Sequence, residues 1–143
     1  MGYYYGFDPT IILVLIGVLL SAAASAKVNS TFNKYAGVRS ACGMTGAEVA
    51  KRLLNSQGIY DVAVHSVKGN LTDHYDPRTK TVNLSQSVYS ATSIAALGVA
   101  AHECGHAIQD AKNYGPLKLR GAFVPIANFG SQLSWPMILI GLF

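Results

Sequence analysis

Charged side chains are scarce in this sequence: they make up 13% of its 143 residues, whereas apolar residues make up 50%. Soluble domains usually carry about 25% charged residues, and disordered chains carry few apolar ones. The composition therefore excludes a disordered chain and is atypical of a soluble domain. Cysteine is also scarce, because Cys42 and Cys104 are the only two. Two thiols exclude a disulfide framework and are compatible with a reducing compartment.

Basic residues are absent from both ends of the chain. All eleven Lys and Arg residues lie between Lys27 and Arg120, and Asp8 is the only charged residue outside that segment. Nucleic-acid-binding domains usually gather basic residues on one face, with aromatic residues among them. Here the basic residues are scattered, so we expect no nucleic-acid partner and attribute their distribution to membrane topology.

The first uncharged segment, Thr10–Ala26, follows a polar and aromatic leader at residues 1–9. Its length is near the lower limit of about 17 residues for a helix that spans a bilayer. A cleaved signal peptide is the alternative, because Ala24-Ser-Ala26 fits a small-residue cleavage site. The leader has no Lys or Arg, however, and its Tyr3-Tyr-Tyr5 run is typical of an interfacial anchor. We therefore predict a retained transmembrane helix.

The second uncharged segment, residues 121–143, reaches the last residue and is interrupted by Pro125 and Pro136. Basic residues follow the first segment and precede the second. They are Lys27, Lys34 and Arg39 after the first, and Lys112, Lys118 and Arg120 before the second. We predict that residues 121–143 form a second transmembrane or hydrophobic segment, in a multi-pass protein of the plasma membrane. The positive-inside rule then places the domain at 27–120 in the cytoplasm and the N-terminus outside. Because no polar residue follows the second segment, we expect the sequence to be a fragment.

Helix and strand signals alternate between the two uncharged segments. Thr45-Gly-Ala-Glu48 is a capping box, which predicts a helix that ends near Gly58. Residues 59–67 alternate in polarity as strands do, and Asp76-Pro77 predicts a turn between a short strand and another at Thr81–Leu84. Ser90, Thr92 and Ser93 are candidate caps of a long helix to about Lys112, ended by Gly115-Pro116. The pattern predicts an α+β membrane protein, mostly helical, with a small β-sheet or hairpin between two transmembrane helices.

The last of these helices contains His102-Glu-Cys-Gly-His106, a His-Glu-x-x-His arrangement. Residues four apart project from one helix face about 6 Å apart along the axis, so both imidazoles can bind one zinc ion at about 2.0–2.1 Å. Glu103 is rotated off that face but remains close enough to take a proton from a zinc-bound water. We predict His102 and His106 as metal ligands and Glu103 as the catalytic base.

Residues 94–101, 107 and 108 make this helix apolar nearly all round, so we expect it to be buried. Burying two histidines and a glutamate without partners would cost several kcal/mol, and a bound metal offsets that cost. The alternative is a chance match, with the histidines hydrogen-bonded inside a core. Cys104 points about 200° away from His102 around the helix, and we interpret it as a core residue.

The third zinc ligand is not evident from the residues. Gln109 and Lys112 stand where the metzincin pattern has Gly and His, which excludes that class, and no His, Asp or Glu follows Asp110. Asp110 cannot converge with both histidines on one ion along a straight helix. Either the ligand lies beyond residue 143, which we favour, or an upstream side chain folds back onto the metal. The upstream candidates are Asp73, His74 and Asp76.

Four segments resemble the YugP-type neutral zinc metallopeptidases of bacterial membranes: Thr45-Gly-Ala-Glu-Val-Ala50, Leu71-Thr-Asp-His-Tyr-Asp-Pro-Arg-Thr-Lys-Thr-Val82, Leu84-Ser85 and Val99-Ala-Ala-His-Glu-Cys-Gly-His-Ala-Ile-Gln109. The similarity covers nearly the whole chain. That family is distantly similar to the membrane protease HtpX, a gluzincin. The resemblance implies a zincin-like catalytic core and a zinc cofactor. It also implies a third ligand that is a glutamate on a later helix, beyond residue 143.

The sequence therefore predicts a membrane-anchored zinc endopeptidase that acts on protein or peptide substrates from the cytoplasmic side of a lipid bilayer. We expect Thr81–Leu84 to pair with an extended substrate by strand addition, and His74 to orient a turn or line the substrate groove. Two alternatives stay open. One is a non-catalytic membrane protein that holds a structural metal or none and acts through partners. The other is a zinc hydrolase of non-peptide amides or esters.

Overall fold

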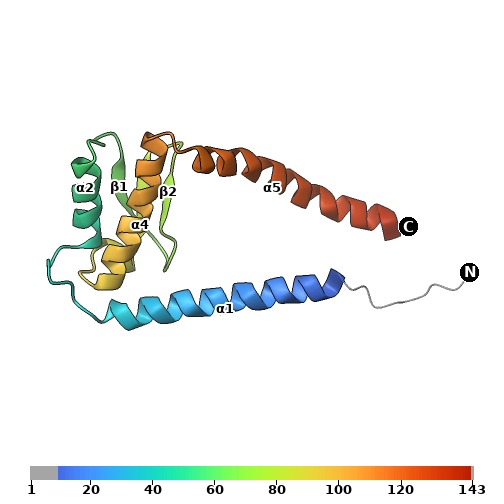
Figure 1. Ribbon diagram of the computed structural model, residues 1–143, viewed down its shortest axis with the longest axis horizontal. Coiled ribbons are helices and arrows are strands. Elements are labelled where there is room, and N and C mark those ends of the chain that lie inside the picture. The colour runs from blue at the N-terminus through green and yellow to red at the C-terminus, as the bar shows by residue number, and fades with distance from the viewer. Residues whose placement is uncertain (1–9, 143) are drawn as a thin grey trace, which may run out of the picture.

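Two long helices extend from a small α/β core in the computed structural model, which describes residues 10–142 (Figure 1). The leader at 1–9, with its tyrosine run, lies outside the described residues. The elements in chain order are α1 (Thr10–Ala36), α2 (Gly46–Ser56), β1 (Ala63–Val67), β2 (His74–Asp76), β3 (Thr81–Ser85), α3 (Gln86–Tyr89), α4 (Ile94–Ala111) and α5 (Gly115–Leu142). The chain is α+β, mostly helical with a small sheet, as the sequence predicts.

The three strands form one sheet in the order β1-β3-β2. Strand β3 pairs in parallel with β1 and antiparallel with β2, so both of its edges are occupied. Val82 and Leu84 of β3 are fully buried, as expected for a central strand. The expectation that Thr81–Leu84 adds a substrate strand is therefore wrong, because its backbone groups already bond to neighbouring strands within the chain.

Helix α4 packs one face against α2 and the sheet. Four small residues spaced three or four apart along α4 are fully buried: Ala96, Ala100, Cys104 and Ala107. This spacing places them on one side of the helix, and their small size lets Leu54 of α2 pack closely, at 2% exposure. The other side of α4 is open, since Ile94 is 46% exposed and His102 is also exposed. The expectation of a helix buried all round is therefore wrong.

The helix ends follow the local sequence signals closely. Thr45 and Glu48 form the complete capping box of α2, and the Ser93 hydroxyl accepts from the N–H of Ala96 to cap α4. Helix α4 stops at Lys112, and the chain then turns through Asn113, whose φ is 55°. Gly115 and Pro116 begin α5 rather than follow the end of α4, because proline is well tolerated in the first turn of a helix.

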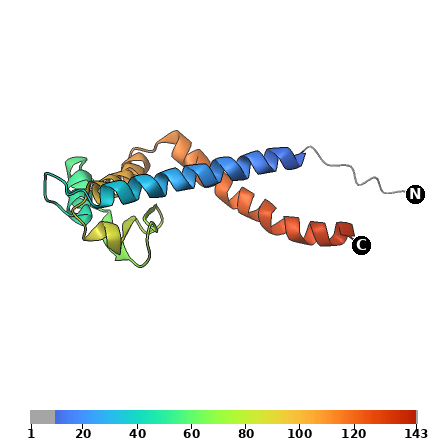
Figure 2. The ribbon, with the colours of Figure 1, turned by 90° about the horizontal axis from the view of Figure 1, so that it is seen from below.

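The two long helices leave the core in the same direction, as both ribbon views show (Figures 1 and 2). None of the residues of α1 is buried, and this helix continues beyond Ala26 to Ala36. Among the helices of residues 10–142, only α1 has the length and apolar composition of a membrane-spanning helix. Helix α5 contains the second uncharged segment and exposes most of its large apolar side chains, although Pro125 and Pro136 lie within it.

Candidate functional site

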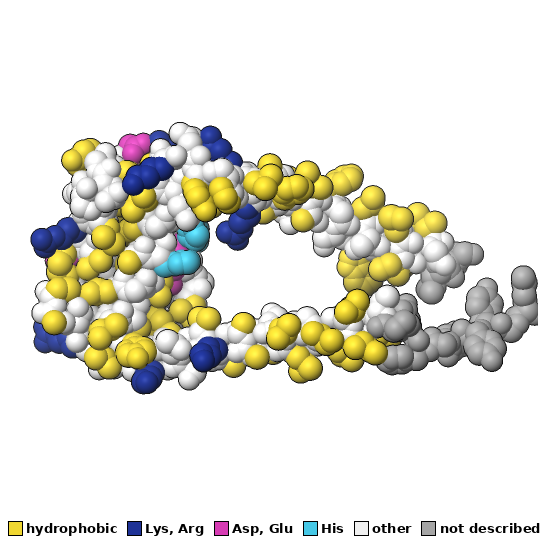
Figure 3. Space-filling view, viewed as in Figure 1, with side chains coloured by type: hydrophobic (Ala, Val, Ile, Leu, Met, Phe, Trp, Pro, Cys, Tyr) yellow, Lys and Arg dark blue, Asp and Glu magenta, His cyan; other side chains and the backbone are white. Residues whose placement is uncertain are grey.

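Helix α4 brings His102 and His106 together on its open side. Their ring centroids lie 4.7 Å apart, and the ring planes meet edge to face at 80°. His102 is exposed and His106 is half-buried. Imidazole side chains lie on the face of the core that looks into the space between α1 and α5 (Figure 3). The two rings are therefore close enough to reach one shared ligand.

Gln109 contacts the imidazole of His106. Its Oε1 lies 3.2 Å from Nδ1 of the ring. An amide oxygen accepts hydrogen bonds, so this contact favours the tautomer with the proton on Nδ1. That tautomer leaves the lone pair of Nε2 available to a metal. The i+3 spacing of Gln109 from His106 was the sequence signal for this contact.

Glu103 occupies a buried position beside the two histidines. Glu103 as a whole residue is 8% exposed. Among residues 10–142, no hydrogen bond or ion pair holds its carboxylate. Its carboxylate oxygens reach the open side of the site, since no buried side-chain oxygen of the described residues lacks a partner. Glu103 lines a cavity of about 300 Å³ together with His102 and Asp73. Its carboxylate is thus placed to act on a molecule held in that cavity.

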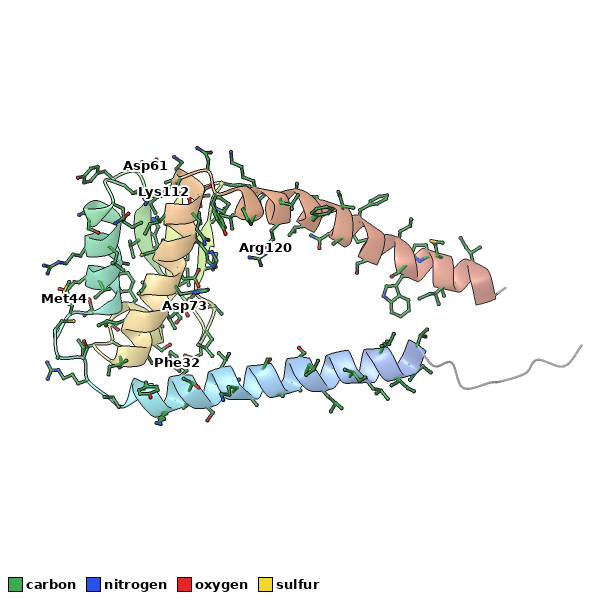
Figure 4. The ribbon with its side chains drawn as sticks, viewed as in Figure 1. Phe32, Met44, Asp61, Asp73, Lys112 and Arg120 are labelled. Atoms are coloured by element: carbon green, nitrogen blue, oxygen red, sulfur yellow. The ribbon has the colours of Figure 1, made fainter. Side chains whose placement is uncertain are left out.

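Asp73 reaches the same cavity and is held there by Ser85. The carboxylate accepts from the backbone N–H of Ser85 at 2.7 Å and from its hydroxyl at 3.0 and 3.1 Å. Ser85 ends β3 and is fully buried, while Asp73 immediately precedes β2 and lies beside α4 (Figure 4). The sequence pointed to Asp73 as a candidate ligand but gave no signal for Ser85, which is 12 residues away.

The other two upstream candidates face different neighbours. The ring of His74 contacts the carbonyl oxygen of Thr72 at 2.8 Å through Nδ1 and the amide of Asn83 at 3.3 Å through Nε2. Asp76 accepts from the backbone N–H of Arg78 in the turn. Within residues 10–142, no group of three His, Cys, Asp or Glu side chains is arranged to hold a metal ion.

A hydrogen bond links the sheet to the end of α4. The Tyr75 hydroxyl donates to Oδ2 of Asp110 at 2.9 Å. Burial and this contact raise the pKa of Tyr75 well above its usual value. Cys104 lies on the core side of α4 and is fully buried, as predicted. Burial, with a smaller effect from the charge of Glu103, raises the pKa of Cys104 to about 11.

Comparison with known proteins shows the family of the chain. A family model described as "Putative neutral zinc metallopeptidase" matches residues 10–143. The chain belongs to this family. The chain is also 47% identical over 131 residues to the "Putative membrane protease YugP" of Bacillus subtilis (strain 168). The match covers 92% of the chain but 58% of that relative, so the chain spans a little over half of its length. No solved structure matches the chain.

Proposed function

We propose that this chain belongs to a membrane-anchored, zinc-dependent endopeptidase. His102 and His106 are its metal ligands, and Glu103 is its general base. One arrangement carries the proposal: the Glu103 carboxylate, which no hydrogen bond or ion pair holds among residues 10–142, lines a cavity with His102, whose ring lies 4.7 Å from that of His106. The names of the family and of the bacterial relative support the same activity.

The residues present can supply two of the protein ligands that a catalytic zinc ion needs. Such ions usually have three protein ligands, and His102 and His106 supply imidazole nitrogens, which zinc favours. Within residues 10–142, no group of three suitable side chains is arranged to hold a metal ion. We propose a glutamate beyond residue 143 as the third ligand. The complete site then belongs to a longer protein than the 143 residues described by this sequence.

Two side chains besides the metal ligands have distinct tasks in this proposal. Gln109 holds the Nδ1 proton of His106, which keeps Nε2 available. Glu103 takes a proton from a water molecule in the cavity as that water attacks the peptide carbonyl, and it then donates the proton to the departing amine. Bound zinc would lower the pKa of such a water to about 7 and polarise the carbonyl.

We further propose that α1 crosses the plasma membrane, that the apolar part of α5 re-enters it, and that the core is cytoplasmic. Helix α1 has no buried residue, and α5 exposes most of its large apolar side chains. The two helices leave the core in the same direction (Figure 1). The basic residues of both helices lie toward their core ends, as the positive-inside rule requires. The face that carries the histidines would then look toward the bilayer surface.

The proposal is tested by Glu103→Gln in the full-length protein, with Glu48→Gln as the matched control. We expect Glu103→Gln to retain zinc and to lower the rate of casein cleavage by about 10²–10⁴-fold, whereas Glu48→Gln retains both. Loss of zinc together with activity would assign Glu103 a structural role. A wild-type protein that binds zinc and cleaves neither casein nor small peptides would favour the non-catalytic alternative. Cleavage of small amides or esters alone would favour the non-peptide hydrolase.

A further inference from the structure

An open apolar groove runs between α1 and α4. It has a volume of about 410 Å³, in the range of about 300–1,000 Å³ typical of ligand pockets. Helix α1 contributes Val28, Phe32 and Tyr35, and α4 contributes Ile94, Gly98 and Val99. Phe32, the one residue of α1 that is not exposed, lies where α1 meets α4 (Figure 4). A large apolar surface that stays open usually marks a binding site.

The groove adjoins the cavity that contains Glu103. Val28, Leu71, Gly98 and Val99 line both spaces, so the two lie side by side. One end of the combined space therefore carries His102, Glu103 and Asp73, and the other end is apolar. A polypeptide matches this division when its backbone amide lies at the polar end and an adjacent apolar side chain lies in the groove.

Leu71 and Gly98 border the point where the two spaces meet. Leu71 has a φ of 55°, a left-handed conformation that costs energy for a leucine. It nevertheless places a large apolar side chain, 42% exposed, at this junction. Gly98 leaves the junction open, because a Cβ atom added there would meet nothing within 4 Å. A larger side chain at position 98 would therefore narrow the passage without displacing its neighbours.

We propose that this groove is a specificity subsite, which accepts one large apolar side chain next to the bond that Glu103 helps to cleave. The proposal rests on the endopeptidase function above and narrows its substrates to polypeptides with Leu, Ile, Met or Phe beside the cleaved bond. Lys27, the first charged residue after the apolar part of α1, also borders the groove. The subsite thus lies close to where α1 would leave the bilayer, within reach of polypeptides near the membrane surface.

The first test compares full-length wild type, Gly98→Leu and Ala111→Leu by mapping cleavage sites in β-casein with mass spectrometry. Ala111 ends α4, is exposed and borders neither space, so it is the matched control. We expect wild type and Ala111→Leu to favour large apolar residues at one position beside the cleaved bond. Gly98→Leu should cleave those sites about tenfold or more slowly and shift toward Ala and Gly. An unchanged preference in Gly98→Leu, or none in the wild type, would overturn the subsite.

The second test needs no turnover. The peptide acetyl-Ala-Ala-Bpa-Ala-Ala-amide, in which Bpa is photoreactive p-benzoylphenylalanine, is crosslinked to full-length Glu103→Gln and the labelled residues are mapped. We expect labelling at residues 28–35, 71 and 94–99, and its loss in Glu103→Gln combined with Gly98→Leu. Labelling elsewhere, or a groove already filled by the protein's own later residues, would overturn the proposal. Labelling of the groove in a full-length protein that cleaves no peptide would instead contradict the endopeptidase function and leave the apolar site standing.

Discussion

The amide oxygen of Gln109 lies 3.2 Å from Nδ1 of His106, one helical turn away on α4. This contact favours the tautomer of His106 with the proton on Nδ1. The centroid of the His106 ring lies 4.7 Å from that of His102. Partners of this kind fix the tautomer and direction of a metal-binding histidine. Gln109 is therefore a positioning residue for the proposed zinc site.

Replacing Gln109 by Leu should weaken zinc binding by the full-length protein about 10–100-fold, because His106 loses its fixed tautomer. Competition with a chromophoric chelator measures the affinity. Gln109→Glu keeps an acceptor oxygen and should restore much of the binding, and Gln86→Leu on α3 serves as an exposed control. Equal zinc affinities in wild type and Gln109→Leu would show that this contact does not position the ring.

Replacing Ser85 by Ala should lower the free energy of unfolding by about 1.5–3 kcal/mol, since a charged carboxylate loses the hydroxyl that donates to it. Urea denaturation followed by circular dichroism measures the change. Ser66→Ala, at an exposed position on β1, is the control and should shift stability by less than about 0.5 kcal/mol. Similar losses in the two variants would contradict the account of how Asp73 is held.

The two cysteines should differ sharply in reactivity, which gives a test of topology. Cys42 is exposed, and a hydrogen bond from Ser40 lowers its pKa, whereas burial raises the pKa of Cys104 to about 11. A membrane-impermeant maleimide should therefore label Cys42 in inside-out vesicles but not in intact cells, and Cys42→Ser should abolish labelling. Labelling of intact cells would place the core outside the cytoplasm.

The capping box of α2 should make stability depend on pH in the acid range. Hydrogen bonds from the backbone and hydroxyl of Thr45 lower the pKa of Glu48 below 4.5. The folded state therefore binds this proton less readily than the unfolded state. The stabilisation is complete above pH 4.5 and is lost as the pH falls through the lowered value. Denaturation of wild type and Glu48→Gln across pH 3–7 should show curves that converge at low pH, and parallel curves would refute this role.

Local signals in the sequence predicted the elements that local chemistry determines. Thr45 and Glu48 marked the start of α2, Ser93 marked the start of α4, and Asp76-Pro77 marked the turn between β2 and β3. These features depend on contacts between residues a few positions apart. The spacing of His102 and His106 likewise predicted that their rings would meet on one side of α4.

Contacts between distant residues could not be read in the same way. The central place of β3 depends on pairing with both β1 and β2, and the Tyr75–Asp110 hydrogen bond joins residues 35 positions apart. Composition also misled: α4 is apolar nearly all round, yet one side remains open and borders the groove. Helix α1 continues past Lys27 to Ala36. A membrane span needs an uncharged apolar segment, whereas a helix can continue through polar and charged residues.

The most direct test is the zinc content of the purified full-length protein, measured by inductively coupled plasma mass spectrometry. We expect about one zinc ion per chain in the wild type and in His65→Ala, whose histidine lies on β1 away from α4. We expect the ion to be lost from the double variant His102→Ala, His106→Ala. A metal-free wild type, or a double variant that keeps its zinc, would contradict the central claim.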